Sequence, residues 1–381
     1  MYQATTNKLI SISRYGIGAL LCLNLLACSS DTTVHEVEEP LEQIPMQFSQ
    51  AAVDAPLTRA TTTRADDTSK PLKQGFLVSC FKGSSKQTVM DRYEVKYKTN
   101  PWENSSQWGY VGKKGDTEAE FWQDQIQRYW DISAFPYQFY AISPCPAHDA
   151  IKKFTISSEQ LIIPAPFSYQ TCTNGTPATV TEPYYVAEAT YHQAERVALP
   201  FRHIMSKVRF GIYSTKQLAS SNFNLSDLKV KVVSGDFIIA AAGYSATTSD
   251  IFNGTFTEPT TAATDTEKLL LQTGDSNIDM SGATVKEKAY FAGSDAGLLQ
   301  IPQADVQLKI SFKINGTQYD DITIAIKDGE KSTDSFTWEP NKFYTYYINI
   351  SELSPLTIEF SAQLSPWTDV VGAIIDTNLE K

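Results

Sequence analysis

Histidine, cysteine and the residue arrangements that catalysis requires are scarce in this sequence. It contains 4 His and 5 Cys among 381 residues. No Gly-x-Ser-x-Gly, His-Glu-x-x-His or Cys-x-x-Cys motif occurs, and no Gly-rich phosphate loop. His203 has no second histidine or carboxylate at the spacing of a metal site or an acid–base pair, so we interpret it as structural. We therefore expect a protein that is not an enzyme and that binds no metal and no cofactor.

Long apolar segments and a positive net charge are also missing. Beyond residue 27, no run approaches the ~20 apolar residues that a membrane-spanning helix needs. The net charge of −11 at pH 7 argues against nucleic acid as a partner. Helix-forming runs of Ala, Leu, Glu and Lys are nearly absent, whereas the chain holds 19 Tyr, 19 Phe and 6 Trp. This composition favours strands over helices.

The first 28 residues carry an export signal. Lys8 and Arg14 precede an apolar run at 16–27, which at roughly 12 residues is too short to span a membrane and is typical of a signal peptide at 1–27. The run ends in Leu25-Leu26-Ala27-Cys28, the order of a bacterial lipobox. We therefore predict a lipoprotein acylated on Cys28, by chains such as palmitate, and held at the outer membrane or cell surface; the alternative is an ordinary cleaved signal.

The remaining cysteines are too few for a disulfide framework. Cys22 leaves with the signal peptide, and lipidation occupies Cys28. Cys80, Cys145 and Cys172 are left, an odd number that allows at most one bridge. We expect free, buried thiols.

Residues 28–65 are predicted to be a lipidated pro-segment. Ile44, Met46 and Phe48 alternate with polar residues, which predicts a short strand at 44–53. The Thr- and Asp-rich stretch that follows contains Arg59 and Arg64 and has little hydrophobicity, so we expect a loop open to proteases. A strand therefore precedes a cleavable loop.

The rest of the chain alternates short strand patterns with turn signals. Asn253-Gly254, Asn315-Gly316 and Asp328-Gly329 are typical of hairpin turns. Many short strands with such turns predict an all-β protein, and the length predicts two domains. We place a β-sandwich at 66–197 and a second one at 198–381. Strands are expected at 76–81, 93–97, 137–143, 228–232, 306–312, 322–326, 343–350 and 356–364.

A set of motifs in a fixed order carries a resemblance to a known family. After the lipobox come Thr58-Arg59-Ala60, Thr63-Arg64-Ala65, Tyr129-Trp130, the stretch 137–144, the stretch 199–210, Ile301-Pro302-Gln303, Trp338-Glu339-Pro340-Asn341 and Trp367. In this order the chain resembles the fimbrillins, pilin-like lipoproteins of Bacteroidota that build type V pili. The stretch 199–210 is the most specific part of the resemblance.

The resemblance implies two transthyretin-like β-sandwiches and a mechanism of assembly. In fimbrillins an N-terminal strand completes the first sandwich of the precursor, and an Arg-specific protease cuts the loop behind it. A strand of another pilin subunit then fills the apolar groove, which builds a fimbrium for cell adhesion to a host or bacterial surface ligand. Such head-to-tail insertion grows filaments because it does not close.

Mapped onto this chain, the resemblance assigns a role to three segments. The leaving strand would use Ile44, Met46 and Phe48 as a plug, so that aspartate at Ile44 or Phe48 would destabilise the precursor. The cut would follow Arg59 or Arg64. The donor strand would lie near the C-terminus; residues 370–375 are either this donor or the last strand of the second domain. Its apolar side chains are Val370, Val371, Ile374 and Ile375.

A different function remains open from the sequence alone. Trp102, Trp108 and Trp122 fall in one stretch, and flat aromatic rings can stack on sugar rings. The alternative is therefore a surface glycan-binding lipoprotein that does not polymerise.

Overall fold

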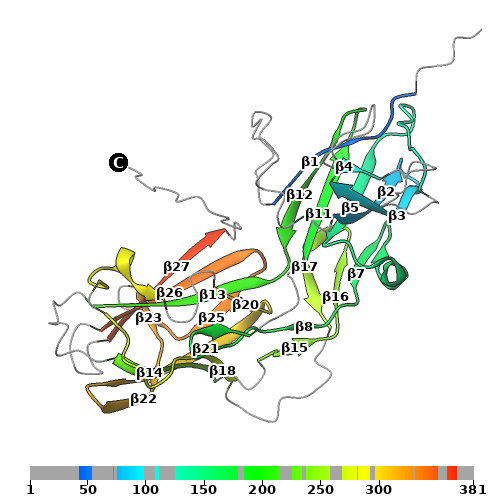
Figure 1. Ribbon diagram of the computed structural model, residues 1–381. Helices are drawn as coiled ribbons and strands as arrows, with labels where there is room; N and C mark the ends of the chain where they lie inside the picture. Colours follow the sequence, from blue (N-terminus) through cyan, green and yellow to red (C-terminus); the bar gives the residue numbers. More distant parts are fainter. Residues whose placement is uncertain are drawn as a thin grey trace, which may run out of the picture. The chain divides into compact units, whose positions relative to one another are not determined.

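The computed structural model is built almost entirely of β-strands (Figure 1). Within the described residues the exceptions are two short 3-10 helices, η1 (His148–Lys153) and η2 (Lys286–Lys288). No helix in this part of the chain has the length and hydrophobicity to cross a membrane. The predicted all-β class, with sandwich-type domains, is confirmed. The structure describes residues 43–53, 72, 75–97, 108–110, 125–178, 184–214, 225–233, 237–257, 268–280, 282–291, 297–328, 331–350 and 358–366.

Seven strands of the N-terminal half close on themselves into a barrel. The pairings are antiparallel except one: β1 runs parallel to β12. The hydrogen-bonded order around the barrel is β1 (Phe48–Val53), β12 (Val197–His203), β11 (Tyr185–Tyr191), β5 (Tyr137–Ser143), β2 (Phe76–Lys82), β3 (Gln87–Tyr97) and β4 (Trp108–Gly109).

Strand β2 shows why a continuous apolar run forms a strand here. Phe76, Val78 and Cys80 belong to the core inside the barrel, together with Met46 and Phe48. Its other face belongs to a second core, because Leu77 and Phe81 pack there. A strand buried on both faces needs apolar residues at every position rather than at alternate ones.

The second core lies between the barrel and a small sheet. Tyr140 of β5 shares this core with Ile163 and Tyr244, which come from neighbouring strands of that sheet. The sheet has the order β17 (Asp250–Phe256), β16 (Tyr244–Thr247), β7 (Gln160–Ile163) and β6 (Thr155–Ile156), and beside it β8 (Phe167–Ser168) pairs with β15 (Ala240–Ala241).

The C-terminal half holds two larger sheets around a third core. Phe210 of one sheet stacks on Tyr346, and both share this core with Phe312 of the other sheet. The first sheet orders β19 (Tyr290–Phe291), β13 (Ser206–Tyr213), β26 (Lys342–Ile350) and β27 (Ile358–Pro366), and β20 (Leu298–Gln300) also pairs with β13. The second orders β10 (Thr176–Pro177), β9 (Cys172–Thr173), β18 (Lys268–Gln272), β14 (Leu225–Val232), β21 (Gln303–Ile314) and β22 (Thr317–Thr323), with β25 (Ser335–Trp338) on β21; β23 (Ile326–Asp328) pairs with β24 (Lys331–Thr333).

The chain passes from the barrel to the C-terminal sheets in the stretch that carries the strongest family resemblance. Strand β12 ends at His203 and β13 begins at Ser206. The His203 backbone N–H donates to Asn341 Oδ1 over 3.2 Å. Strands β7, β8 and β9 precede residue 197 in the chain, yet they pair with β16, β15 and β18, which all begin after residue 239. The domain division at 197/198 stays a prediction.

The three cysteines of the described chain are free thiols. Cys80 and Cys172 are buried, and Cys145 is partly buried. Burial raises the pKa of the Cys145 thiol to about 12, so it is protonated at neutral pH.

Candidate functional site

The strand β1 and the two strands that flank it form the candidate site. Strand β1 fills the position between β12 and β4, which we call the β1 slot. Against β12 its register joins Phe48 to Val197 and Val53 to Phe201, and against β4 it joins Phe48 to Trp108. Without β1 the barrel would be an open sheet whose two edges are β12 and β4, with unpaired backbone groups along both.

Strand β1 is not tied to the barrel by a hairpin. Its neighbour along the chain is β2, but in the barrel β12, β11 and β5 stand between them on one side and β4 and β3 on the other. Residues 54–75 connect β1 to β2. A parallel pair such as β1 with β12 always needs a long connection, in contrast to the two-residue turns of antiparallel neighbours. No hairpin turn therefore positions β1 in the slot; its contacts with the barrel do.

Among the side chains that the structure describes in this segment, those of residues 43–48, two apolar ones belong to the barrel core. Met46 is fully buried and Phe48 is 2% exposed. The Phe48 ring lies edge-on to Phe76, Tyr110 and Phe139, with ring centroids 5.6, 5.7 and 6.2 Å apart. Burying two side chains of this size stabilises the barrel by roughly 1.5–3 kcal/mol each.

Ile44, predicted to be the third plug residue, does not enter the slot. Its side chain is 47% exposed, so this part of the prediction is wrong. The regular strand begins only at Phe48, and residue 45 makes an isolated bridge to Tyr129. The Ile44 backbone carbonyl accepts a hydrogen bond from Trp130 N over 2.9 Å. Ile44 contributes backbone pairing where the alternation predicted a buried side chain.

Backbone and side-chain hydrogen bonds hold the start of β1. Met46 N donates to the carbonyl of Arg128 over 2.8 Å, and Val197 N donates to that of Gln47 over 2.8 Å. The Met46 carbonyl accepts from the Tyr110 hydroxyl at 2.9 Å and from Gln127 Nε2 at 3.1 Å. We call Tyr110 and Gln127 the carbonyl clamp.

The clamp hydroxyl is fixed in its donor form. Burial raises the pKa of Tyr110 well above its ordinary value. The hydroxyl is therefore protonated at neutral pH, and it can donate to a carbonyl.

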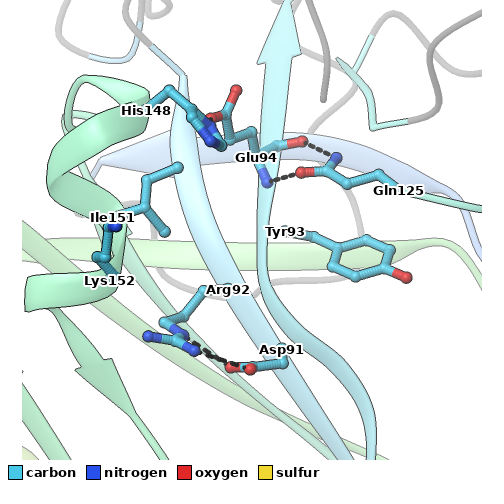
Figure 2. A pocket seen from close by; sticks show the side chains of 8 residues that line it. All are labelled: Asp91, Arg92, Tyr93, Glu94, Gln125, His148, Ile151 and Lys152. Carbon is cyan, nitrogen blue, oxygen red and sulfur yellow. Dashed lines mark hydrogen bonds and ion pairs between the residues drawn. The ribbon is translucent and has the colours of Figure 1, made fainter. Parts of the chain in front are cut away.

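A pocket of about 250 Å³ lies behind the clamp, between β3 and η1 (Figure 2). Two pairs of polar groups line it: Arg92 Nε and Nη2 lie 2.8 and 2.9 Å from the two Asp91 oxygens, and His148 Nδ1 lies 3.1 Å from Glu94 Oε1. Gln125 bonds both backbone groups of Glu94, with Glu94 N donating to its Oε1 at 2.7 Å and its Nε2 donating to Glu94 O at 3.0 Å. The pocket wall thus fixes the segment that leads to the clamp.

The remaining predicted site residues are placed as follows. Trp108 is 3% exposed and lies 5.4 Å from Phe76 inside the barrel, so the prediction that it forms a sugar-stacking surface is wrong. His203 is 1% exposed and its ring lies 4.1 Å from that of Tyr185. In the part of the chain that the structure describes, no group of three or more His, Cys, Asp or Glu is placed to hold a metal. Outside the described residues lie Cys28, Arg59, Arg64, Trp102, Trp122, Val370, Val371, Ile374 and Ile375.

Sequence reasoning missed Tyr110, Gln125 and Gln127. Tyr110 and Met46 are 64 positions apart, and Gln127 and Met46 are 81 apart. No local spacing connects such residues. The sequence pointed to this region only through the stretch 199–210, whose first residues pair with β1.

The sequence matches the family model described as fimbrillin-like over residues 58–367. The chain belongs to the fimbrillin-like family. This confirms the resemblance drawn from the ordered motifs. No curated protein matches this fimbrillin-like chain.

Solved structures are similar to this fimbrillin-like chain. A fimbrial protein from Bacteroides vulgatus is similar with a TM-score of 0.54 and 15% sequence identity, over 85% of this chain and 99% of that one. A candidate cell adhesion protein from Bacteroides uniformis has a TM-score of 0.42 and 14% identity, over 86% of this chain and 99% of that one. At such identities the first likeness shows a shared fold.

Proposed function

We propose that this fimbrillin-like protein is a subunit of a fimbrium that serves cell adhesion, exported as an outer-membrane lipoprotein on Cys28. Cleavage after Arg59 or Arg64 frees β1, and a strand of another pilin subunit enters the β1 slot. The observation that carries the proposal is that β1 joins β12 to β4 and so closes the barrel, with Met46 and Phe48 buried and without a hairpin to its neighbours.

The contacts of β1 support release after a cut. While residues 54–75 are intact, the strand remains attached and rebinds at once, because its local concentration is high. After a cut, a competing strand can replace it without a loss of slot contacts. The family match begins at residue 58, beyond β1 and next to Arg59.

The slot supports an extended strand as the incoming partner. Its edges offer backbone donors and acceptors, and its interior offers space for two apolar side chains, which is the pattern of β-augmentation. A donor from the C-terminus would come from the residues after β27, which include Val370, Val371, Ile374 and Ile375. The glycan-binding alternative loses Trp108, which lies in the core.

Mass spectrometry of surface-shed material tests the proposal. We expect mature N-termini at Ala60 or Ala65 in polymers that migrate as a ladder. Substituting Arg59 and Arg64 together by Gln should leave the protein as an acylated monomer, whereas either single substitution alone shows which arginine is used. Shed polymer that carries only the acylated Cys28 terminus would contradict cleavage.

A further inference from the structure

The hydrogen bonds of the carbonyl clamp reach the backbone at Met46, two residues before β1, while the Tyr110 ring also packs edge-on against Phe48 with centroids 5.7 Å apart. Tyr110 Oη and Gln127 Nε2 both reach the Met46 carbonyl, at 2.9 and 3.1 Å. A carbonyl is present in every residue, so these two bonds do not depend on which strand fills the slot. Specificity for side chains resides in the space that Met46 and Phe48 occupy.

The clamp is assembled by bonds that do not involve β1. Gln127 Nε2 lies 2.7 Å from Tyr110 Oη and 2.8 Å from the Arg128 carbonyl, so its two hydrogens are shared among these acceptors and the more distant Met46 carbonyl. Arg128 N donates to Tyr110 Oη at 3.1 Å. Arg128 also donates through Nε and Nη2 to the Tyr93 hydroxyl, at 3.0 and 2.7 Å. These contacts orient the clamp when the slot is empty.

The clamp is also anchored to the barrel wall. Gln125 Nε2 donates to the Tyr110 carbonyl at 2.6 Å. It also donates to Glu94 O at 3.0 Å (Figure 2). The anchor therefore lies on β3 and beside β4, strands that stay when β1 leaves. Preorganised groups bind more tightly because their ordering has already occurred.

We propose that Tyr110 and Gln127 are a register stop for strand exchange: they capture one backbone carbonyl of any extended segment that enters the β1 slot, including a segment from a second copy of this chain. This inference rests on the proposed function. The captured carbonyl belongs to the residue at the Met46 position, so an incoming segment needs an apolar residue there and another two positions later, where Phe48 lies.

The test uses the full chain and cuts the connection between β1 and β2 in a way that does not depend on the proposed cleavage after arginine. A site for an unrelated sequence-specific protease replaces residues 58–64, and the protein is cut in solution. Two labelled synthetic peptides, one of residues 43–53 and one of residues 366–381, are then each titrated with an excess of the cut protein. Fluorescence anisotropy gives the dissociation constant of each.

Removing both donors should weaken both peptides equally. Tyr110→Phe with Gln127→Met leaves a buried carbonyl without a donor, and we expect dissociation constants higher by about 10- to 100-fold. Tyr110→Phe alone retains Gln127 and should weaken binding by about 3- to 10-fold. The matched control is Tyr244→Phe, which loses a buried hydroxyl that bonds Ile251 O at 2.8 Å in another sheet, and its peptide affinities should be unchanged.

The outcomes separate the clamp from strand exchange. Equal affinities of wild type and the double variant for peptide 43–53 would overturn the register stop and leave strand exchange standing. Weakened binding of peptide 43–53, with no binding of peptide 366–381 to any variant, would support the stop and count against the C-terminal donor. If neither peptide enters the cut wild-type protein, both ideas are wrong. The uncut double variant, which keeps β1 attached, shows by its unfolding curve that it folds.

Discussion

Phe48 is the residue of β1 whose loss the structure predicts to matter most. Its ring is 2% exposed and meets three aromatic rings at centroid distances of 5.6–6.2 Å. Replacing a buried Phe by Ala costs about 3–5 kcal/mol, a range that already includes the lost ring contacts. We expect Phe48→Ala to lower the free energy of unfolding of the uncut protein by about 4 kcal/mol. A loss of this size is a large part of the unfolding free energy of a typical domain, which is about 5–15 kcal/mol.

Urea unfolding followed by tryptophan fluorescence measures this change, because Trp108 and Trp130 are buried in the barrel core. With a slope of about 2 kcal/mol per molar urea, the midpoint should fall by about 2 M. Ile44→Ala is the matched control in the same segment, and its 47% exposed side chain predicts a change within about 0.5 kcal/mol. A Phe48→Ala midpoint equal to that of the control would refute the view that β1 completes the core.

Three further outcomes follow from the structure. Ile44→Asp should change the free energy of unfolding by less than about 0.5 kcal/mol, whereas Met46→Asp, which buries a charge, should abolish the cooperative fluorescence transition. Hydrogen bonds from Lys82 and Ser133 lower the pKa of Asp131 from 3.8 to about 2. The stabilisation by this carboxylate is therefore present above pH 3.8 and is lost as the pH falls through 2. Carboxyl-carbon NMR should show a titration midpoint near 2, and the midpoint should return toward 3.8 in Lys82→Met. Cys145, with a pKa of about 12, should react with iodoacetamide at pH 8 on the order of a thousandfold more slowly than free cysteine.

Much of the strand content could be predicted from the sequence. The apolar run of β2 and the aromatic strands β5 and β26 all occur where the patterns indicate them. Period-two alternation reports which residues share a face, provided that the strand is regular. Ile44 lies before the regular part of β1, and that is why the alternation misassigned it.

The barrel closure and the clamp could not be predicted from the residues alone. Strand β1 pairs with β12 across almost 150 positions, and the clamp reaches Met46 from 64 and 81 positions away. Such contacts depend on the complete topology, which local secondary-structure propensities do not determine. The burial of Trp108 has the same origin: its place in the core follows from the pairing of β4 with β1 and β3.

The identity of the strand in the slot of the assembled fimbrium is the central question. A photoreactive benzoylphenylalanine in place of Trp108, which pairs with β1 at Phe48, records that strand directly. In the uncut precursor the cross-link should reach residues 43–53 of the same chain. In purified fimbriae, mass spectrometry should find it joined to a C-terminal segment of another subunit. Cross-links to residues 43–53 in the assembled fimbriae would contradict strand exchange.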